Sequence, residues 1–145
     1  MNMRIAPRVL AEVRHHLAAA YPAEGCGMLL GTRGPNGDVV VRRQLSVPNR
    51  RAVDGGGRTR YLIAPGDFLA AEQEARQAGL VVVGTYHSHP DVPARPSAYD
   101  TEHAWPWCCY LITSVAGGEV EEERVWELRD DRSGFVEREL EVKEF

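Results

Sequence analysis

The sequence predicts an α+β fold: a mixed, mostly antiparallel central sheet flanked by two longer helices and one short helix. Two segments carry apolar residues at helical spacing, and short apolar or alternating segments bounded by turn residues fill most of the remaining chain. A length of 145 residues suits one domain, which would bury roughly 70% of the surface of its unfolded chain. We therefore expect residues 1–145 to form a single domain.

The two longer helices are expected near the N-terminus and in the middle of the chain. Over Pro7–Tyr21, the apolar residues Leu10, Val13 and Leu17 recur at spacings of three and four, and proline is favoured in a first helical turn. Over Pro65–Ala78 the apolar stripe is weaker, but a glycine follows directly and suits a helix end.

Strands are expected where apolar or β-favouring runs lie between turn residues. The strongest hairpin signal is Asn36-Gly37. The run Leu80–Gly84 is apolar throughout, as expected of a strand that is buried on both faces. The expected strands are Gly27–Gly31, Val39–Val47, Arg60–Ala64, Leu80–Gly84, Trp107–Ser114, Glu119–Leu128 and Phe135–Val142.

Charge and composition argue against several classes of function. The net charge is −4, made of −6 in residues 119–145 and +2 in the remainder, so neither part is a basic nucleic-acid footprint. No apolar run approaches the roughly 20 residues of a membrane span, and no signal peptide begins the chain, so we expect a cytoplasmic protein without a membrane partner. The three cysteines lack CxxC spacing and predict neither a disulfide framework nor a cysteine-rich zinc site.

Two histidines follow the apolar strand at Leu80–Gly84. In Tyr86-His87-Ser88-His89-Pro90, His87 and His89 are two residues apart and would share one face of a strand, so their imidazoles can converge on one metal ion. The alternative is a pair of histidines on a half-exposed strand end. Zinc needs at least one more protein ligand and, in hydrolytic sites, leaves a position to water.

Candidates for the third ligand lie downstream and are Asp91, Asp100, Glu102 and His103. Asp91 is too close to the strand end to fold back, whereas the proline-rich loop can return Asp100 to the cleft at the start of a short helix over Ser97–Ala104. Ser97 and Asp100 also match a capping box, which satisfies free amides at a helix start. Capping and metal binding are compatible, because the positive end of a helix attracts a carboxylate.

Glu24 is the candidate acid–base group. It lies between the first helix and the first buried strand, among small and apolar residues. Partial burial would raise its pKa toward the range that is useful for proton transfer. The alternative is a carboxylate that caps a helix or binds a loop amide.

Together these residues resemble the JAMM/MPN zinc metalloprotease family, whose signature is an upstream Glu followed by H-x-H-x7-S-x2-D. Seven residues separate His89 from Ser97 and two separate Ser97 from Asp100, so no signature position is substituted. The resemblance covers roughly residues 8–114 and implies a cytidine-deaminase-like MPN fold. It also implies that His87, His89 and Asp100 bind Zn2+, that Glu24 is the general base toward a zinc-activated water, and that Ser97 hydrogen-bonds the oxyanion.

The resemblance further implies a substrate class. Members cleave a peptide or isopeptide bond after the C-terminal Gly-Gly of a ubiquitin-like protein, and this short chain is similar to stand-alone bacterial members that act on small sulfur-carrier proteins. One alternative is an MPN scaffold that binds protein without metal or catalysis, against which the intact signature argues. Another is a JAMM-type domain associated with DNA repair or phage tails, against which the negative charge argues.

Two regions have open roles. The segment Asn49–Arg60, rich in glycine and arginine, is interpreted as a flap that contacts substrate, with an ordinary solvated loop as the alternative. Trp105 and Trp107 can line either the cleft or the core, and we expect the core.

Overall fold

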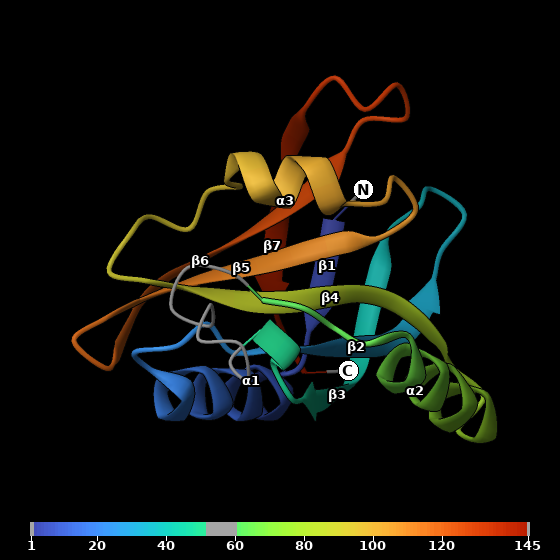
Figure 1. The fold of residues 1–145 in the computed structure, drawn as a ribbon. Helices are drawn as coiled ribbons and strands as arrows, with labels where there is room; N and C mark the ends of the chain where they lie inside the picture. Colours follow the sequence, from blue (N-terminus) through green and yellow to red (C-terminus); the bar gives the residue numbers. More distant parts are fainter. Residues whose placement is uncertain (1, 52–60, 145) are drawn as a thin grey trace.

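The computed structural model describes residues 2–51 and 61–144. Within these ranges the chain forms seven strands and three helices (Figure 1). The strands are β1 (Asn2–Ile5), β2 (Cys26–Arg33), β3 (Val39–Val47), β4 (Val81–Pro90), β5 (Cys109–Ala116), β6 (Glu119–Leu128) and β7 (Phe135–Val142). The helices are α1 (Pro7–Ala20), α2 (Pro65–Gln77) and α3 (Ala98–His103). The predicted α+β class, with two longer helices and one short helix, is confirmed.

The sheet closes on itself in the order β1-β3-β2-β4-β5-β6-β7. The pairs β2–β3, β2–β4, β5–β6 and β6–β7 are antiparallel, and β1–β3, β1–β7 and β4–β5 are parallel. The sheet is therefore mixed and mostly antiparallel, as predicted, but it is a closed barrel rather than the expected flanked central sheet. Closure depends on β1, which the sequence analysis did not predict and in which Met3 and Ile5 are buried while Asn2 and Arg4 are exposed.

Strand β2 is packed on both faces, because its alternate side chains belong to two different apolar clusters. Leu29 joins the core under α1, where the apolar stripe of that helix is buried. Met28 and Leu30 point the other way and join a second cluster with Ala71 and Ala75 of α2. In Figure 1, α1 and α2 are drawn at the bottom of the view and α3 at the top. Because side chains of a strand alternate between faces, one strand serves both clusters.

The expectation of a strand over Arg60–Ala64 is wrong for the residues that the structure describes. Residues 61–64 form no strand, and Arg60 lies outside the described residues. The backbone of Leu62 is instead bound to the neighbouring loop: its amide donates to Asn49 Oδ1 at 3.1 Å, and its carbonyl accepts from the Arg50 amide at 3.0 Å. Tyr61 and Ile63 pack against the α2 cluster. Their apolar character, which suggested a strand, reflects this packing.

None of the helices in the described ranges combines the length and apolarity that a membrane crossing requires.

Candidate metal centre

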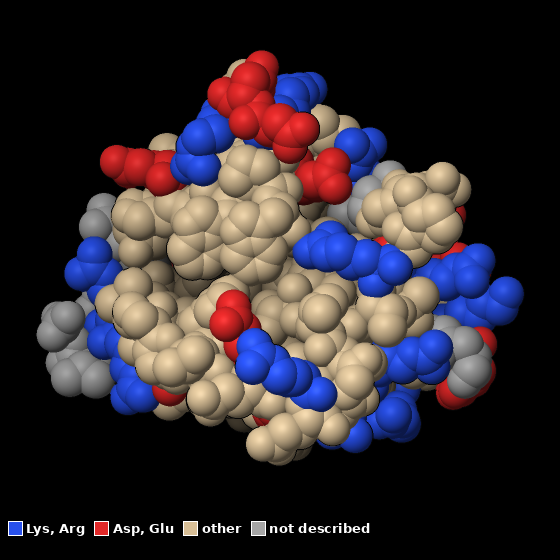
Figure 2. Space-filling view, turned by 90° about the vertical axis from the view of Figure 1, so that its right-hand side faces the viewer, with Lys and Arg blue, Asp and Glu red and all other residues tan. Residues whose placement is uncertain are grey.

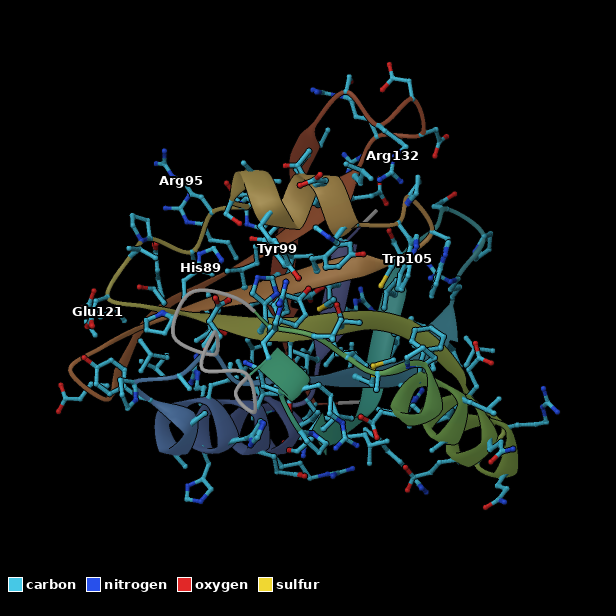
Figure 3. All side chains as sticks on the ribbon, in the orientation of Figure 1. His89, Arg95, Tyr99, Trp105, Glu121 and Arg132 are labelled. Atoms are coloured by element: carbon cyan, nitrogen blue, oxygen red, sulfur yellow. The ribbon has the colours of Figure 1, made fainter. Side chains whose placement is uncertain are left out.

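Strand β4 carries His87 and His89 into the interior on one face. His87 pairs with Cys26 of β2 and with Ile112 of β5, so the strand is held on both sides at this point. Both imidazoles are buried, and their Nε2 atoms lie 3.3 Å apart. In Figure 3 the site lies between β4 and α3, near the labels of His89 and Tyr99. The two-residue spacing thus brings two ligand nitrogens together.

Helix α3 brings Asp100 to the same point. Ser97 Oγ accepts from the Asp100 amide at 3.1 Å, and the Ser97 amide donates to Asp100 Oδ2 at 2.8 Å, which completes the predicted capping box. The same carboxylate faces the histidines, with Oδ1 3.3 Å from His87 Nε2 and Oδ2 3.1 Å from His89 Nε2. Asp100 therefore caps the helix and faces the imidazoles at once.

This donor set fits a four-coordinate zinc ion. Bonds of about 2.0–2.1 Å at tetrahedral angles place neighbouring ligand atoms about 3.3 Å apart. The two imidazole Nε2 atoms lie 3.3 Å apart, and each lies close to a different oxygen of Asp100: Oδ1 is 3.3 Å from His87 Nε2, and Oδ2 is 3.1 Å from His89 Nε2. Two imidazoles and one carboxylate are also a ligand set of hydrolytic zinc sites, which keep the fourth position for water.

The charge states of His87 and Asp100 suit metal binding, whereas His89 must release a proton to bind a cation. Burial would lower the pKa of His89, but its hydrogen bonds with Asp100 and Pro93 outweigh its burial and raise the pKa. Burial lowers the pKa of His87, which favours the neutral imidazole that can donate a lone pair. Burial would raise the pKa of Asp100, but its hydrogen bonds with His87 and His89 outweigh that effect and hold the pKa well below its usual range. The carboxylate is therefore ionised where the cation would bind.

Glu24 lies in the turn between α1 and β2, beside the histidine pair. It is 4% exposed, and its carboxylate and the two imidazoles place their ligand atoms within 4.8 Å of one another. Burial is the main cause that raises the pKa of Glu24 to about 8. A carboxyl group with this pKa can both accept and release a proton near neutral pH.

The backbone around Glu24 is fixed by the strands that carry the rest of the site. Asn49 Nδ2 donates to the Glu24 carbonyl at 2.8 Å, and the Gly25 amide donates to Ser88 Oγ at 2.8 Å. Ser88 lies between the two histidines of β4, so Glu24 and the imidazoles are held to one another. A Cβ at Gly25 would lie 2.9 Å from Leu17 Cδ2, so glycine lets the turn pass close to α1.

The orientation of His89 is set by the loop after β4. Its Nδ1 donates to the carbonyl oxygen of Pro93 at 2.9 Å, which leaves Nε2 as the nitrogen that faces Asp100. Metal-binding histidines commonly donate their second ring nitrogen in this way, which fixes the tautomer.

The other candidate ligands lie outside the cluster. Asp91 accepts from the Tyr21 hydroxyl at 2.7 Å and from the Gly117 amide at 3.1 Å, so it anchors the loop. Glu102 is exposed, and His103 stacks on Tyr99. Of the expected flap, Ala52–Arg60 lies outside the described residues.

The sequence analysis missed the aromatic side chains around the site. Tyr61 stacks on the His87 ring, with centroids 4.3 Å apart. The expectation that Trp105 and Trp107 lie in the core is wrong: each is 48% exposed and lines a pocket beside Asp100. Their spacing of two residues, on either side of Pro106, was a signal that both could face the same way.

The fold and the donor set together define a candidate metalloprotein. One strand and one short helix carry the candidate metal ligands, and a buried glutamate lies beside them. The chain belongs to the family of prokaryotic homologs of the JAB domain, whose model matches residues 6–129. The resemblance to JAMM/MPN proteins is thereby confirmed.

Relatives with descriptive names support this placement. Over 109 residues the chain is 36% identical to a Thermus thermophilus protein named probable TtuB-protein conjugate cleaving protease, a match that covers 75% of this chain and 68% of that one. Over 110 residues it is 34% identical to the desampylase of Haloferax volcanii, and the match covers 75% of each. A solution structure of a Salinibacter ruber protein is 43% identical with a TM-score of 0.76, covering 98% of this chain and 92% of that one.

Proposed function

We propose that this protein is a zinc-dependent peptidase that hydrolyses the peptide or isopeptide bond after the C-terminal Gly-Gly of a ubiquitin-like or sulfur-carrier protein. The observation that carries the proposal is the placement of buried Glu24 within 4.8 Å of the two imidazoles, beside the Asp100 carboxylate, whose two oxygens lie 3.3 and 3.1 Å from the imidazole nitrogens. The names of the Thermus and Haloferax relatives support the substrate class.

His87, His89 and Asp100 would hold the zinc ion. When bound, zinc polarises the scissile carbonyl and lowers the pKa of water to about 7, which supplies a nucleophile at neutral pH. The ligands themselves are held by β4 and by the cap of α3, so they need little rearrangement to accept the ion.

Glu24 is the general base of the proposed reaction. Its carboxylate accepts a proton from the attacking water and passes it to the leaving amine. Burial supports both steps because it raises the pKa of the carboxyl group to about 8 in the protein without metal. A nearby cation lowers such a pKa, so the loaded protein holds Glu24 ionised and ready to accept.

Ser97 is proposed to stabilise the oxyanion. Its Oγ already accepts from the Asp100 amide, so its own hydroxyl proton is available to donate to a substrate oxygen. Ser97 is exposed at the start of α3, where substrate can reach it. Loss of one oxyanion donor typically costs about 100- to 1000-fold in turnover.

The experiment that tests the proposal combines product masses with metal content. The zinc-loaded protein is incubated with ubiquitin-like or sulfur-carrier proteins extended beyond Gly-Gly, with and without a chelator. We expect cleavage after Gly-Gly that the chelator abolishes, and Glu24→Gln should keep zinc while losing at least about 100-fold in turnover. His15→Ala, an exposed histidine on α1, is the control for nonspecific effects. Cleavage that survives in Glu24→Gln would remove Glu24 as the base.

A protein-binding scaffold is the alternative function. It needs neither bound zinc nor an acidic group buried beside the ligands. A protein that binds no zinc after zinc-replete purification, yet binds carrier proteins intact, would establish the scaffold in place of the peptidase.

A further inference from the structure

An apolar pocket of about 490 Å³ opens beside the metal centre. Asp100 belongs to both the pocket and the metal centre. Tyr61 also lines the pocket, and its ring stacks on the ring of His87. A pocket of this volume can enclose a large apolar side chain. The hydrolytic steps proposed above use only Asp100 among the residues that line it.

Three aromatic side chains form the outer wall of the pocket. The indole rings of Trp105 and Trp107 stack with centroids 5.8 Å apart and planes at 10°, and Phe68 of α2 meets both rings edge-on at 5.9 and 5.8 Å. Figure 2 shows the face that carries α2, where uncharged side chains cover most of a broad hollowed area, with a few charged groups at the hollow and more around the edge of the area. Half-exposed tryptophans that line a pocket are typical of a binding surface rather than of an ordinary solvent-exposed loop.

This wall is fixed by hydrogen bonds to the barrel. Arg33 Nη2 donates to the carbonyls of Trp107 at 2.6 Å and Val83 at 3.2 Å. The Trp105 amide donates to the Tyr110 hydroxyl at 2.8 Å. The segment after α3 is therefore held in place at both tryptophans, so the pocket is formed before any ligand arrives and binding would cost little ordering.

The position of the pocket indicates which part of a substrate reaches it. Glu24 forms a compact group with the imidazoles, whereas the pocket borders Asp100 and, among the described residues, is not lined by Glu24. In the proposed reaction Glu24 gives its proton to the leaving amine, so the amine lies on the Glu24 side. The acyl segment, which precedes the scissile bond, then extends toward the pocket.

We propose that this pocket binds a large apolar side chain of the acyl segment, upstream of the two glycines, and that Phe68, Trp105 and Trp107 determine this specificity. The inference rests on the proposed function. Two glycines offer no side chain by which one tail can be told from another, so discrimination must come from residues before them. An apolar pocket typically gives about 10- to 100-fold discrimination in kcat/KM.

The test uses octapeptides that end in Gly-Gly joined to the ε-amine of a lysine. One set carries leucine at the third, fourth or fifth position before the scissile bond and serine elsewhere, a second carries serine throughout, and a third carries leucine only on the lysine side. Cleavage is followed by mass, and binding is followed by tryptophan fluorescence in the Glu24→Gln protein. We expect leucine at one acyl position to raise kcat/KM and affinity at least about 10-fold over serine.

Substitutions in the aromatic wall test the role of the pocket, and a substitution outside the pocket is the control. Trp105→Ala and Trp107→Ala should bring the leucine-to-serine ratio close to one, and Trp105→Phe should keep most of it. Leu69→Ala is the matched control, because Leu69 follows Phe68 on α2 and is 55% exposed, yet does not line the pocket. The ratio should not change in that variant. Melting temperatures show whether each variant folds.

Each outcome decides the assignment. Equal cleavage of leucine and serine peptides, a preference only on the lysine side, or a ratio that survives in both alanine variants would overturn the pocket assignment while the peptidase stands. Selective binding without cleavage by the wild type would support the pocket and remove the peptidase. A dimer that dissociates in Trp105→Ala would make the pocket a contact between two copies, which also overturns the assignment.

Discussion

Trp126 on β6 donates its indole N–H to the carbonyl oxygen of Ala94 at 3.0 Å. The adjacent carbonyl, that of Pro93, is the one that accepts from His89 Nδ1. The same loop is held by Ser114 of β5, whose Oγ donates to the Val92 carbonyl at 2.7 Å. The orientation of a proposed metal ligand therefore depends on strands that carry no ligand themselves.

Trp126→Phe removes this N–H and keeps an aromatic ring. We expect zinc affinity to fall about 10-fold, because groups that orient metal-binding histidines typically contribute 10- to 100-fold. Competition with a chromophoric chelator measures the change. Phe135→Leu, which alters the same apolar cluster without touching the loop, should leave zinc affinity within about twofold. Equal affinities in wild type and Trp126→Phe would show that the loop is held without this bond.

The two roles of Asp100 can be separated. Asp100→Asn keeps an oxygen that can accept from the Ser97 amide but loses the charge, so we expect zinc affinity to fall at least about 100-fold. Ser97→Ala removes one half of the capping box, costs about 1 kcal/mol of unfolding free energy and leaves the ligands in place. Calorimetric zinc titration and urea unfolding on both variants check this. If Ser97→Ala lost zinc as fully as Asp100→Asn, zinc binding would depend on the helix cap, and the two roles of Asp100 would not be separable.

Glu24 makes the stability of the metal-free protein depend on pH. Its pKa is raised from 4.5 to about 8 in the folded protein, chiefly by burial. A raised carboxyl pKa means that its contribution to stability is present below pH 4.5 and is lost as the pH rises through 8. With chelator, the wild type should lose on the order of 3 kcal/mol relative to Glu24→Gln between pH 5 and 8. Parallel melting curves for the two proteins across this range would contradict the assigned burial.

Gly31 is required where β2 shifts register against β3. A Cβ there would lie 1.8 Å from the Val40 carbonyl oxygen, so a substitution must move backbone. We expect Gly31→Ala to cost about 3 kcal/mol or more of unfolding free energy. Gly66→Ala is the matched control, because nothing lies within 4 Å of a Cβ at that position of α2. Urea unfolding measures both, and comparable stabilities would show that the bulge can adapt.

The placement of the proposed site residues was predictable, because their spacing along the chain, together with the expected strand and helix, determines where their side chains lie. A separation of two on a strand brings His87 beside His89, and a serine three residues before an aspartate brings Asp100 to a helix start. Glu24 was predictable as an acidic residue in an apolar segment, and its burial agrees with that prediction.

What the sequence analysis missed depends on contacts between distant segments. The four residues of β1 show too short an alternation to predict a strand, and their partners β3 and β7 lie far along the chain. Residues 61–64 have strand-like composition, but the backbone amide and carbonyl of Leu62 are hydrogen-bonded to Asn49 and Arg50 and not to another strand. Trp105 and Trp107 are of a residue type that is often buried, and the hydrogen bonds from Arg33 and to Tyr110, which fix the backbone at both positions, join segments far apart in the sequence.

Zinc stoichiometry and affinity across ligand variants test the central claim most directly. The wild type should bind one zinc ion per chain, and His87→Ala, His89→Ala and Asp100→Ala should each lose at least about 100-fold in affinity, while His15→Ala on the exposed face of α1 should not change it. Binding that is absent in the wild type, or that survives unchanged in all three ligand variants, would contradict the account.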